Sequence, residues 1–223
     1  MRLGRSPLDR GFKGLRNLTI LSFLAAPAIA EPITIAALGD SLTQGYGLIP
    51  EDGFVPQLQN WLTEHGAEVT LINAGVSGDT TAGGLSRIDW TLTPDVDAVI
   101  VALGGNDVLR GLPPEQAKSN IDAILTKVET RGLPALLVGI DAPPNFGPSY
   151  KADFDALYID LAAKHDVLIF PNILEGLTKI EDRAMVLREH MQDDRIHPNA
   201  SGVSLVVEEI GPKVLELVAK TLP

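Results

Sequence analysis

The sequence predicts an α/β protein in which helices cover both faces of a parallel five-stranded sheet. Five short apolar runs alternate with segments of helical periodicity, and none of the runs alternates strictly between apolar and polar residues. Strands that are apolar on both faces are typical of a buried parallel sheet, and strand–helix alternation is typical of βαβ units. The runs predicted as strands are Ile33–Leu38, Val69–Ile72, Ala98–Leu103, Ala135–Ile140 and Val167–Phe170.

The segments between and after these runs carry apolar residues at the spacing of one helix face. They predict helices around residues 54–62, 117–128, 154–162 and 199–222. Pro113 and Pro114 precede the second of these helices, where the first turn tolerates proline. The simplest organisation is a single domain over residues 31–223, a three-layer α/β/α sandwich with right-handed crossovers.

Residues 1–30 have the organisation of a signal peptide. Five basic residues precede an apolar run from Leu18 to Ala30, which closes on the small-x-small pattern Ala28-Ile29-Ala30. The run is too short to span a bilayer, which needs about 20 residues, so we expect no stable membrane insertion. We expect cleavage near Ala30 and a periplasmic or secreted protein. The alternative is an amphipathic N-terminal helix that stays attached.

Charge and cysteine content exclude several functions. The formal net charge is −11, and removal of the basic N-terminal segment makes the remaining domain more negative. A surface this acidic repels nucleic acid and anionic membranes, so neither is expected as a main partner. The chain has no cysteine, which excludes disulfides, a thiolate nucleophile and cysteine metal ligands. The oligomeric state is left open.

Ser41 lies in the stretch LGDSLTQGYG, immediately after the first predicted strand. Ligands of open parallel sheets bind beyond the carboxyl ends of the strands, so its hydroxyl is a candidate nucleophile. A serine at this junction is also a common helix N-cap. No Walker phosphate loop follows, and Thr43 replaces the second glycine of a G-x-S-x-G elbow. This loop alone does not decide between cap and nucleophile.

Two further loops at the same edge offer hydrogen-bond donors. Gly78 lies in the loop after the second strand, where glycines allow the backbone N–H groups to approach a ligand. Asn106 follows the third strand, and its side-chain amide is suited to stabilising developing negative charge. Each residue also has a simpler interpretation as an ordinary turn residue.

Asp194 and His197 form the remaining candidate pair. His197 precedes a proline and the last predicted helix, and Asp194 lies three residues before it, so one turn can bring the carboxylate to the imidazole. That contact would orient a histidine base toward a serine. A metal pair or a surface turn are the alternatives, although a metal site needs more ligands than this chain readily supplies.

Together the blocks Gly39-Asp40-Ser41, Gly78, Gly104-Gly105-Asn106-Asp107 and Asp194-x-x-His197 resemble, in order, the signatures of the SGNH hydrolases, or GDSL esterase/lipase family. The stretches NAGVSGDTTAGGLSRI, LGGNDVLRG and MQDDRIHPN resemble its bacterial secreted thioesterase/arylesterase/lysophospholipase branch. The resemblance implies a flavodoxin-like sheet, Ser41 as nucleophile, His197 as base and acid, and Asp194 as its orienter. It also implies that the neighbouring acid, Asp193, faces elsewhere. It implies oxyanion donors at the Ser41 and Gly78 backbone and the Asn106 amide.

The same resemblance implies a serine hydrolase for acyl esters that needs no metal and no cofactor. Its substrate would be a small-molecule acyl ester or a lysophospholipid, and Leu109, Leu112, Pro144 and Phe146 would border the acyl pocket. Two other functions stay open at this stage. One is a carbohydrate deacetylase of the same family, and the other is a non-catalytic periplasmic binding protein.

Overall fold

The computed structural model describes residues 32–222. The predicted signal peptide and its cleavage site near Ala30 lie outside these residues, as do the two ends of the predicted domain, Glu31 and Pro223. Among the described residues, no helix has both the length and the hydropathy needed to cross a membrane.

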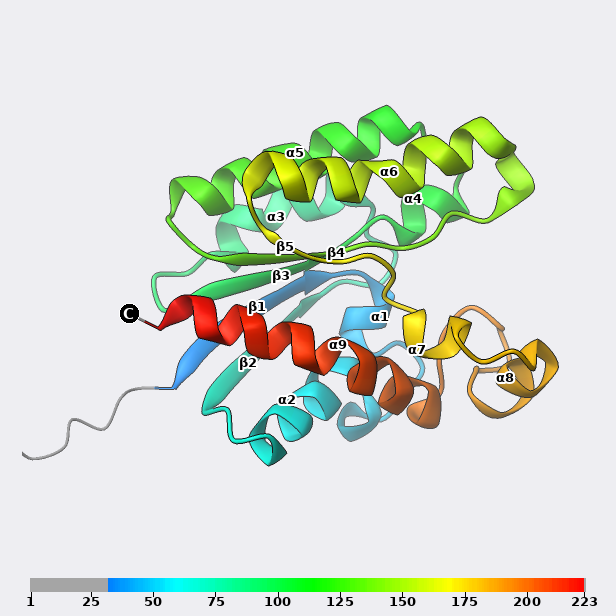
Figure 1. Cartoon of the computed structure of the whole chain (residues 1–223), viewed down its shortest axis with the longest axis horizontal. Helices are drawn as coiled ribbons and strands as arrows, with labels where there is room; N and C mark the ends of the chain where they lie inside the picture. The colour runs from blue at the N-terminus through cyan, green and yellow to red at the C-terminus, as the bar shows by residue number, and fades with distance from the viewer. Residues whose placement is uncertain (1–31, 223) are drawn as a thin grey trace, which may run out of the picture. The chain divides into compact units, whose positions relative to one another are not determined.

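A five-stranded parallel sheet forms the centre of the described chain, with the strand order β2-β1-β3-β4-β5 (Figure 1). This is the flavodoxin-like order, and it confirms the predicted fold class. Each predicted strand is present, with ends shifted by a few residues. The strands are β1 (Ile33–Gly39), β2 (Val69–Gly75), β3 (Ala98–Ala102), β4 (Ala135–Val138) and β5 (Leu168–Phe170).

Helices cover both faces of this sheet, which gives the three layers (Figure 1). One face carries α2 (Phe54–Glu64) and α9 (Ala200–Thr221), which pack against each other. The other face carries α3 (Thr81–Thr91), α5 (Pro114–Thr130) and α6 (Pro148–His165). Four of these five helices were predicted. The glycine-rich α3 was not, because its apolar face is narrow.

The two cores follow the alternation of side chains along each strand. In β1, Ile35 and Ala37 pack into the core under α2 and α9, whereas Ala36 and Leu38 pack into the core under α3, α5 and α6. All four side chains are almost completely buried. Successive strand residues point to opposite faces, so a strand buried on both sides must be apolar at every position. This explains the uninterrupted apolar runs.

Short elements cluster at the carboxyl edge of the sheet, where periodicity cannot predict them. They are α1 (Ser41–Gln44), α4 (Gly105–Leu109), α7 (Glu175–Thr178), α8 (Arg183–Glu189) and the 3-10 turns Pro50–Asp52 and Pro144–Phe146. The α1 helix begins at Ser41, but the capping residue is Asp40, whose Oδ1 accepts a hydrogen bond from the Leu42 N–H at 3.1 Å. The cap interpretation of Ser41 is therefore wrong by one residue.

Gly75, the last residue of β2, lies directly against the backbone of α1. A Cβ at this position would lie 2.3 Å from the Gln44 nitrogen and 2.8 Å from the Thr43 carbonyl carbon. Backbone atoms in a paired strand and a capped helix cannot move aside without cost. The absence of a side chain at Gly75 therefore sets how closely α1, and Ser41 with it, approaches the sheet.

We predict that Gly75→Ala lowers the free energy of unfolding by about 1–3 kcal/mol, the usual cost of overpacking. It should also lower the ester hydrolysis that the sequence resemblance leads us to expect, because α1 must shift. Urea unfolding and a steady-state assay measure the two effects. Gly53→Ala is the matched control, since the nearest atom to its added Cβ lies 3.3 Å away. Equal stability of the Gly75 and Gly53 variants would contradict the prediction.

Candidate active site

Ser41 lies at the start of α1, directly beyond the carboxyl end of β1. The strand pairs with β2 on one side and β3 on the other, so the loops after all three strands meet at one edge. Asp40 caps the helix, and Gly45 ends it with a left-handed φ of 88°. This short helix holds the half-buried Ser41 side chain at the edge where the sequence predicted a ligand site.

His197 links Ser41 to Asp194 across the site. Its Nε2 lies 2.8 Å from the Ser41 Oγ, and its Nδ1 lies 2.6 Å from Asp194 Oδ2. Ser41 is 156 positions away in sequence, whereas Asp194 is only three. Asp193, the neighbouring acid, is exposed and is not part of this chain of contacts. The structure therefore brings the three predicted residues into one hydrogen-bonded line.

Asp194 is held in place by its own segment. Its Oδ1 accepts hydrogen bonds from the backbone N–H groups of Ile196 at 2.9 Å and His197 at 3.0 Å. Desolvation by burial works to raise the pKa of Asp194, but the hydrogen bonds from His197 and Ile196 outweigh it and lower the pKa to about 2. The carboxylate is thus ionised beside the imidazole at neutral pH.

Asn106 lines the same groove as Ser41 and His197, and it is bonded to the loop that contains Gly78. Asn106 Nδ2 donates to the Asp79 carbonyl oxygen at 2.9 Å and lies 3.5 Å from Asp40 Oδ2. It therefore joins the residue after Gly78 to the residue before Ser41. Gly78 has a left-handed φ of 84°. Within residues 32–222, the backbone N–H groups of Ser41 and Gly78 donate to no other group.

A groove opens beside Ser41 and His197 and encloses about 870 Å³, including the space at its mouth. Most of its exposed lining is apolar. Besides the predicted site residues, the groove is lined by Leu42, Val108, Ile140, Asp141, Pro143, Leu174, Arg195 and Ile196. These residues come from five separate segments, and Ile140 and Leu174 lie outside every stretch that the sequence analysis singled out for the site.

The four residues predicted to border the acyl pocket have different positions. Leu109 lines the groove and is 58 % exposed. Leu112, Pro144 and Phe146 do not line it. The Phe146 ring packs instead on Tyr150, with ring centroids 5.0 Å apart, and Tyr150 donates to the Leu112 carbonyl oxygen at 2.9 Å. These contacts join the Phe146 ring and the Leu112 backbone to Tyr150 of α6.

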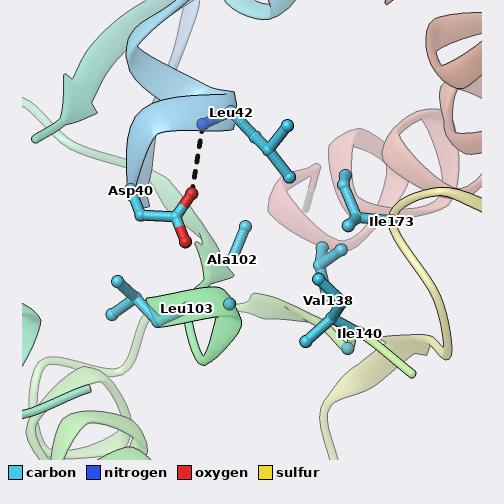
Figure 2. A pocket seen from close by; sticks show the side chains of 9 residues that line it. Asp40, Leu42, Ala102, Leu103, Val138, Ile140 and Ile173 are labelled. Atoms are coloured by element: carbon cyan, nitrogen blue, oxygen red, sulfur yellow. Dashed lines mark hydrogen bonds between the residues drawn. The ribbon is translucent and has the colours of Figure 1, made fainter. Parts of the chain in front are cut away.

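Asp40 is a buried acid to which the sequence analysis gave no role beyond its place in the Gly39-Asp40-Ser41 block. Figure 2 shows its carboxylate facing a small pocket whose walls are largely apolar, with Leu103 and Val138 among them. Burial raises the pKa of Asp40 to about 6, against the opposing effects of the Leu42 N–H and the His197 charge. The burial of Asp40 had no sequence signal beyond its position directly after a buried strand.

Asp107, the acid after Asn106, fixes α4 to the start of α3. Its two carboxylate oxygens accept hydrogen bonds from the Thr81 N–H at 2.8 Å and the Thr81 hydroxyl at 2.7 Å, and both residues are buried. Asn120 donates to the same hydroxyl at 3.0 Å. The network leaves none of its buried side-chain polar atoms without a partner, and it fixes the turn that carries Asn106.

Acids and histidines at the carboxyl edge of a sheet can also bind a metal ion. In the part of the chain that the structure describes, no group of three or more His, Asp or Glu side chains is arranged to hold a metal ion. The Asp194–His197 pair contacts Ser41, which is the arrangement expected for a serine activated by a base.

Comparison with known proteins then decides the family. The family model described as the GDSL-like lipase/acylhydrolase family matches residues 37–205, which span all five strands except the first few residues of β1. The chain belongs to the GDSL-like lipase/acylhydrolase family. This confirms the predicted family and, with it, the class of carboxylic ester hydrolases.

Relatives of this GDSL hydrolase are similar over nearly their full length. Esterase TesA of Pseudomonas aeruginosa is 36 % identical over 91 % of this chain and 97 % of its own. Thioesterase 1/protease 1/lysophospholipase L1 of Escherichia coli K12 is 34 % identical over 90 % of each chain. The crystal structure of AlinE4, an SGNH-hydrolase family esterase, is 43 % identical, with a TM-score of 0.69 over 88 % of this chain and 100 % of that one.

We predict that Asp40→Asn stabilises this GDSL hydrolase more at pH 8 than at pH 4. The folded-state pKa of Asp40 lies above the ordinary 3.8, so the penalty for burying its charge is full above about pH 6 and is absent below pH 3.8. The difference between the two pH values should be about 3 kcal/mol at most. Asparagine keeps the helix cap.

Urea unfolding of wild type and Asp40→Asn at both pH values measures this difference. All other carboxylates are common to the two proteins, so their contributions cancel. A stabilisation of equal size at pH 4 and pH 8 would show that the Asp40 charge carries no burial penalty.

Proposed function

We propose that Ser41, His197 and Asp194 hydrolyse carboxylic esters through an acyl-serine intermediate. The observation that carries this proposal is the line of contacts in which His197 lies 2.8 Å from the Ser41 hydroxyl and 2.6 Å from the Asp194 carboxylate. These are the distances at which a histidine can take a proton from the nucleophile while an acid fixes its tautomer.

In the first half of the reaction, His197 Nε2 accepts the Ser41 proton as Oγ attacks the substrate carbonyl carbon. The carbonyl oxygen becomes an oxyanion, which accepts hydrogen bonds from the Ser41 N–H, the Gly78 N–H and the Asn106 amide. Both backbone donors have no competing acceptor among the described residues. The His197 imidazolium, stabilised by ionised Asp194, then protonates the leaving alcohol, and the acyl-serine remains.

The second half repeats these steps with water. His197 removes a proton from a water molecule, whose oxygen attacks the acyl carbon and forms a second oxyanion at the same donors. Collapse of this intermediate breaks the bond to Ser41 Oγ, which takes the proton back from His197. A carboxylic acid leaves, and the enzyme returns to its starting state.

The groove favours a short to medium acyl ester as substrate. Val108, Leu109 and Ile140 line it beside Ser41, and such side chains suit an acyl chain better than a sugar. A lysophospholipid is the next candidate, in line with the lysophospholipase activity named for the Escherichia coli relative. A non-catalytic binding protein would not need the contact between Ser41 and His197.

We also propose that residues 1–30 are a signal peptide and that the domain acts outside the cytoplasm. The basic segment, the apolar run and the Ala28-Ile29-Ala30 pattern support this. An exported enzyme would not meet cytosolic acyl-CoA thioesters, which again favours oxyesters. Mass spectrometry of the exported protein would identify its N-terminal residue.

Ser41→Ala tests the nucleophile. We expect hydrolysis of p-nitrophenyl butyrate to fall at least about 10⁴-fold, because members of a catalytic triad act as a unit. A fluorophosphonate should label wild type on Ser41 and leave the variant unlabelled. Ser86→Ala is the control, since this exposed serine lies on α3 and bonds only to the Gly83 carbonyl. Wild-type activity in folded Ser41→Ala would refute the proposal.

Asp194→Ala and Asp193→Ala distinguish the two adjacent acids. We expect the first variant to lose roughly 10³- to 10⁴-fold in kcat, because the imidazole loses its orienting carboxylate and its counter-charge. The second should stay within about 3-fold of wild type, since Asp193 is exposed and outside the line of contacts. Steady-state kinetics measure both, and a larger loss from Asp193→Ala would reverse the assignment.

A further inference from the structure

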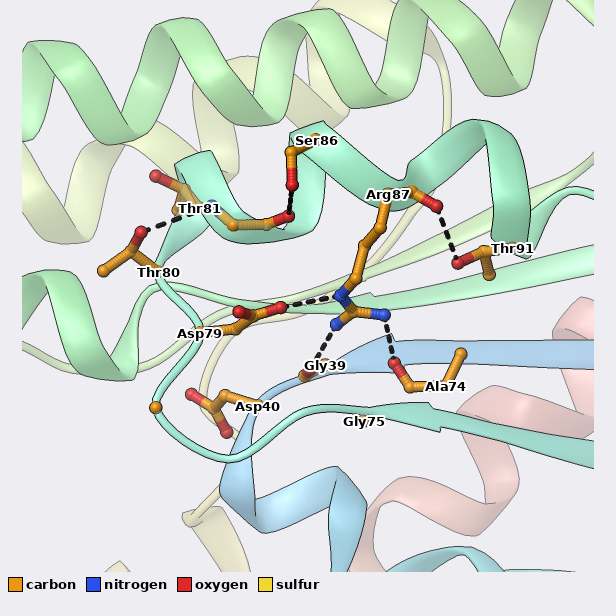
Figure 3. Close-up of polar contacts among 12 residues, drawn as sticks. Gly39, Asp40, Ala74, Gly75, Asp79, Thr80, Thr81, Ser86, Arg87 and Thr91 are labelled. Carbon is orange, nitrogen blue, oxygen red and sulfur yellow. Dashed lines mark hydrogen bonds and ion pairs between the residues drawn. The ribbon is translucent and has the colours of Figure 1, made fainter.

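Arg87 is a half-buried arginine on α3 whose guanidinium reaches across the carboxyl edge of the sheet. Figure 3 shows it between the ends of β1 and β2 on one side and Asp79 on the other. Nε donates to Asp79 Oδ2 at 2.6 Å, Nη1 to the Ala74 carbonyl oxygen at 2.6 Å, and Nη2 to the Gly39 carbonyl oxygen at 2.8 Å. One side chain therefore binds three acceptors in three directions.

Two of these acceptors belong to the strands that lead into the site. Gly39 is the last residue of β1 and lies two positions before Ser41. Ala74 is the penultimate residue of β2 and is paired in register with Leu38 of β1. The arginine thus fixes the ends of two neighbouring strands relative to each other, at the point where both chains leave the sheet.

The third acceptor connects Arg87 to the other two candidate oxyanion donors. Asp79 directly follows Gly78, so its carboxylate ties the Gly78 loop to Arg87. The backbone carbonyl of the same Asp79 accepts the hydrogen bond from Asn106 Nδ2. A change at the Arg87–Asp79 pair is therefore transmitted to Gly78 through one peptide bond and to Asn106 through one hydrogen bond.

The environment of this pair makes it strong. The Arg87 and Asp79 side chains are only 21 % and 19 % exposed, so water screens their charges less than on the open surface. Lysine could not replace the contacts, because an ammonium group lacks the planar fork that reaches three acceptors at once. The charge-assisted hydrogen bond to the Gly39 carbonyl adds a second donor to an oxygen that also accepts from the Val76 N–H at 3.1 Å.

We propose that Arg87 is a positioning residue that sets the mutual geometry of the Ser41 N–H, the Gly78 N–H and the Asn106 amide. It acts through Gly39, Asp79 and the Asp79 carbonyl, and it does not contact the substrate. The inference rests on the proposed function, in which these three groups bind the oxyanion. It predicts that the main effect of losing Arg87 is on the tetrahedral state rather than on ground-state binding.

Kinetics of Arg87→Ala and Arg87→Lys test this role, with Arg131→Ala as the matched control. Arg131 lies at the end of α5, and its Nη1 donates to the Leu92 carbonyl oxygen at 2.6 Å. Neither residue lines the groove. For both Arg87 variants we expect kcat for p-nitrophenyl butyrate to fall by about 10²-fold, with KM changing less than about 3-fold. Arg131→Ala should keep the wild-type kcat and KM.

Two further measurements separate positioning from general stability. A trifluoromethyl ketone, which forms a tetrahedral adduct with the serine, should bind each Arg87 variant more weakly by the same factor as kcat/KM falls. Added guanidinium at millimolar concentration should restore part of the activity of Arg87→Ala and none of that of Arg131→Ala or Ser41→Ala.

Wild-type kcat in folded Arg87→Ala would overturn the inference, as would a lower melting temperature with unchanged kcat and ketone affinity. If Arg87→Ala does not fold, Arg87→Lys decides alone: a reduced kcat with weaker ketone binding supports the role, and wild-type values refute it. Failure of the proposed function is recognised separately, because wild type itself would then resist fluorophosphonate labelling at Ser41.

Discussion

The parallel pairing of β1 between β2 and β3 is the constraint on which the site depends. The three strands run in the same direction, so their carboxyl ends meet at one edge and deliver Ser41, Gly78 and Asn106 there. The pairing is fixed by residues with no chemistry of their own. Every side chain of β1 from Ile35 to Leu38 is buried, and a register shift would expose apolar groups on both faces.

Polar contacts between loops, strand ends and helices organise the carboxyl edge of the sheet. Arg87 donates hydrogen bonds to carbonyls at the ends of β1 and β2. Asp107 accepts a hydrogen bond from the first N–H of α3, and Asp40 caps α1. Each of these contacts joins a loop to an element that the hydrophobic core already holds. The donors beside Ser41 are thus fixed indirectly, through residues that stand one step away from the groove.

The sequence predicted the layers of this fold because burial leaves a clear pattern. The strands β3, β4 and β5 are apolar at every position, and α5 buries Ile121, Ile124 and Val128 on one face. It also predicted the residues that approach Ser41, since Asp194 and His197 are linked by a short spacing. The sequence could not predict features that depend on residues from several separate segments. The burial of Asp40 is produced by Leu103, Val138 and Ile173, and the position of Phe146 is set by Tyr150.

Two properties of the His197 imidazole, its direction and its distance from Ser41, depend on different parts of the chain. The direction of the imidazole is set by hydrogen bonds within four residues, whereas its distance from Ser41 also depends on α9, which begins at Ala200 and packs against the sheet. The first property is encoded in one short stretch of sequence, and the second also involves a hydrophobic interface. Substitutions in α9 can therefore change the distance between His197 and Ser41 without changing the direction of the imidazole, so the site can be altered by repacking a helix that does not line the groove.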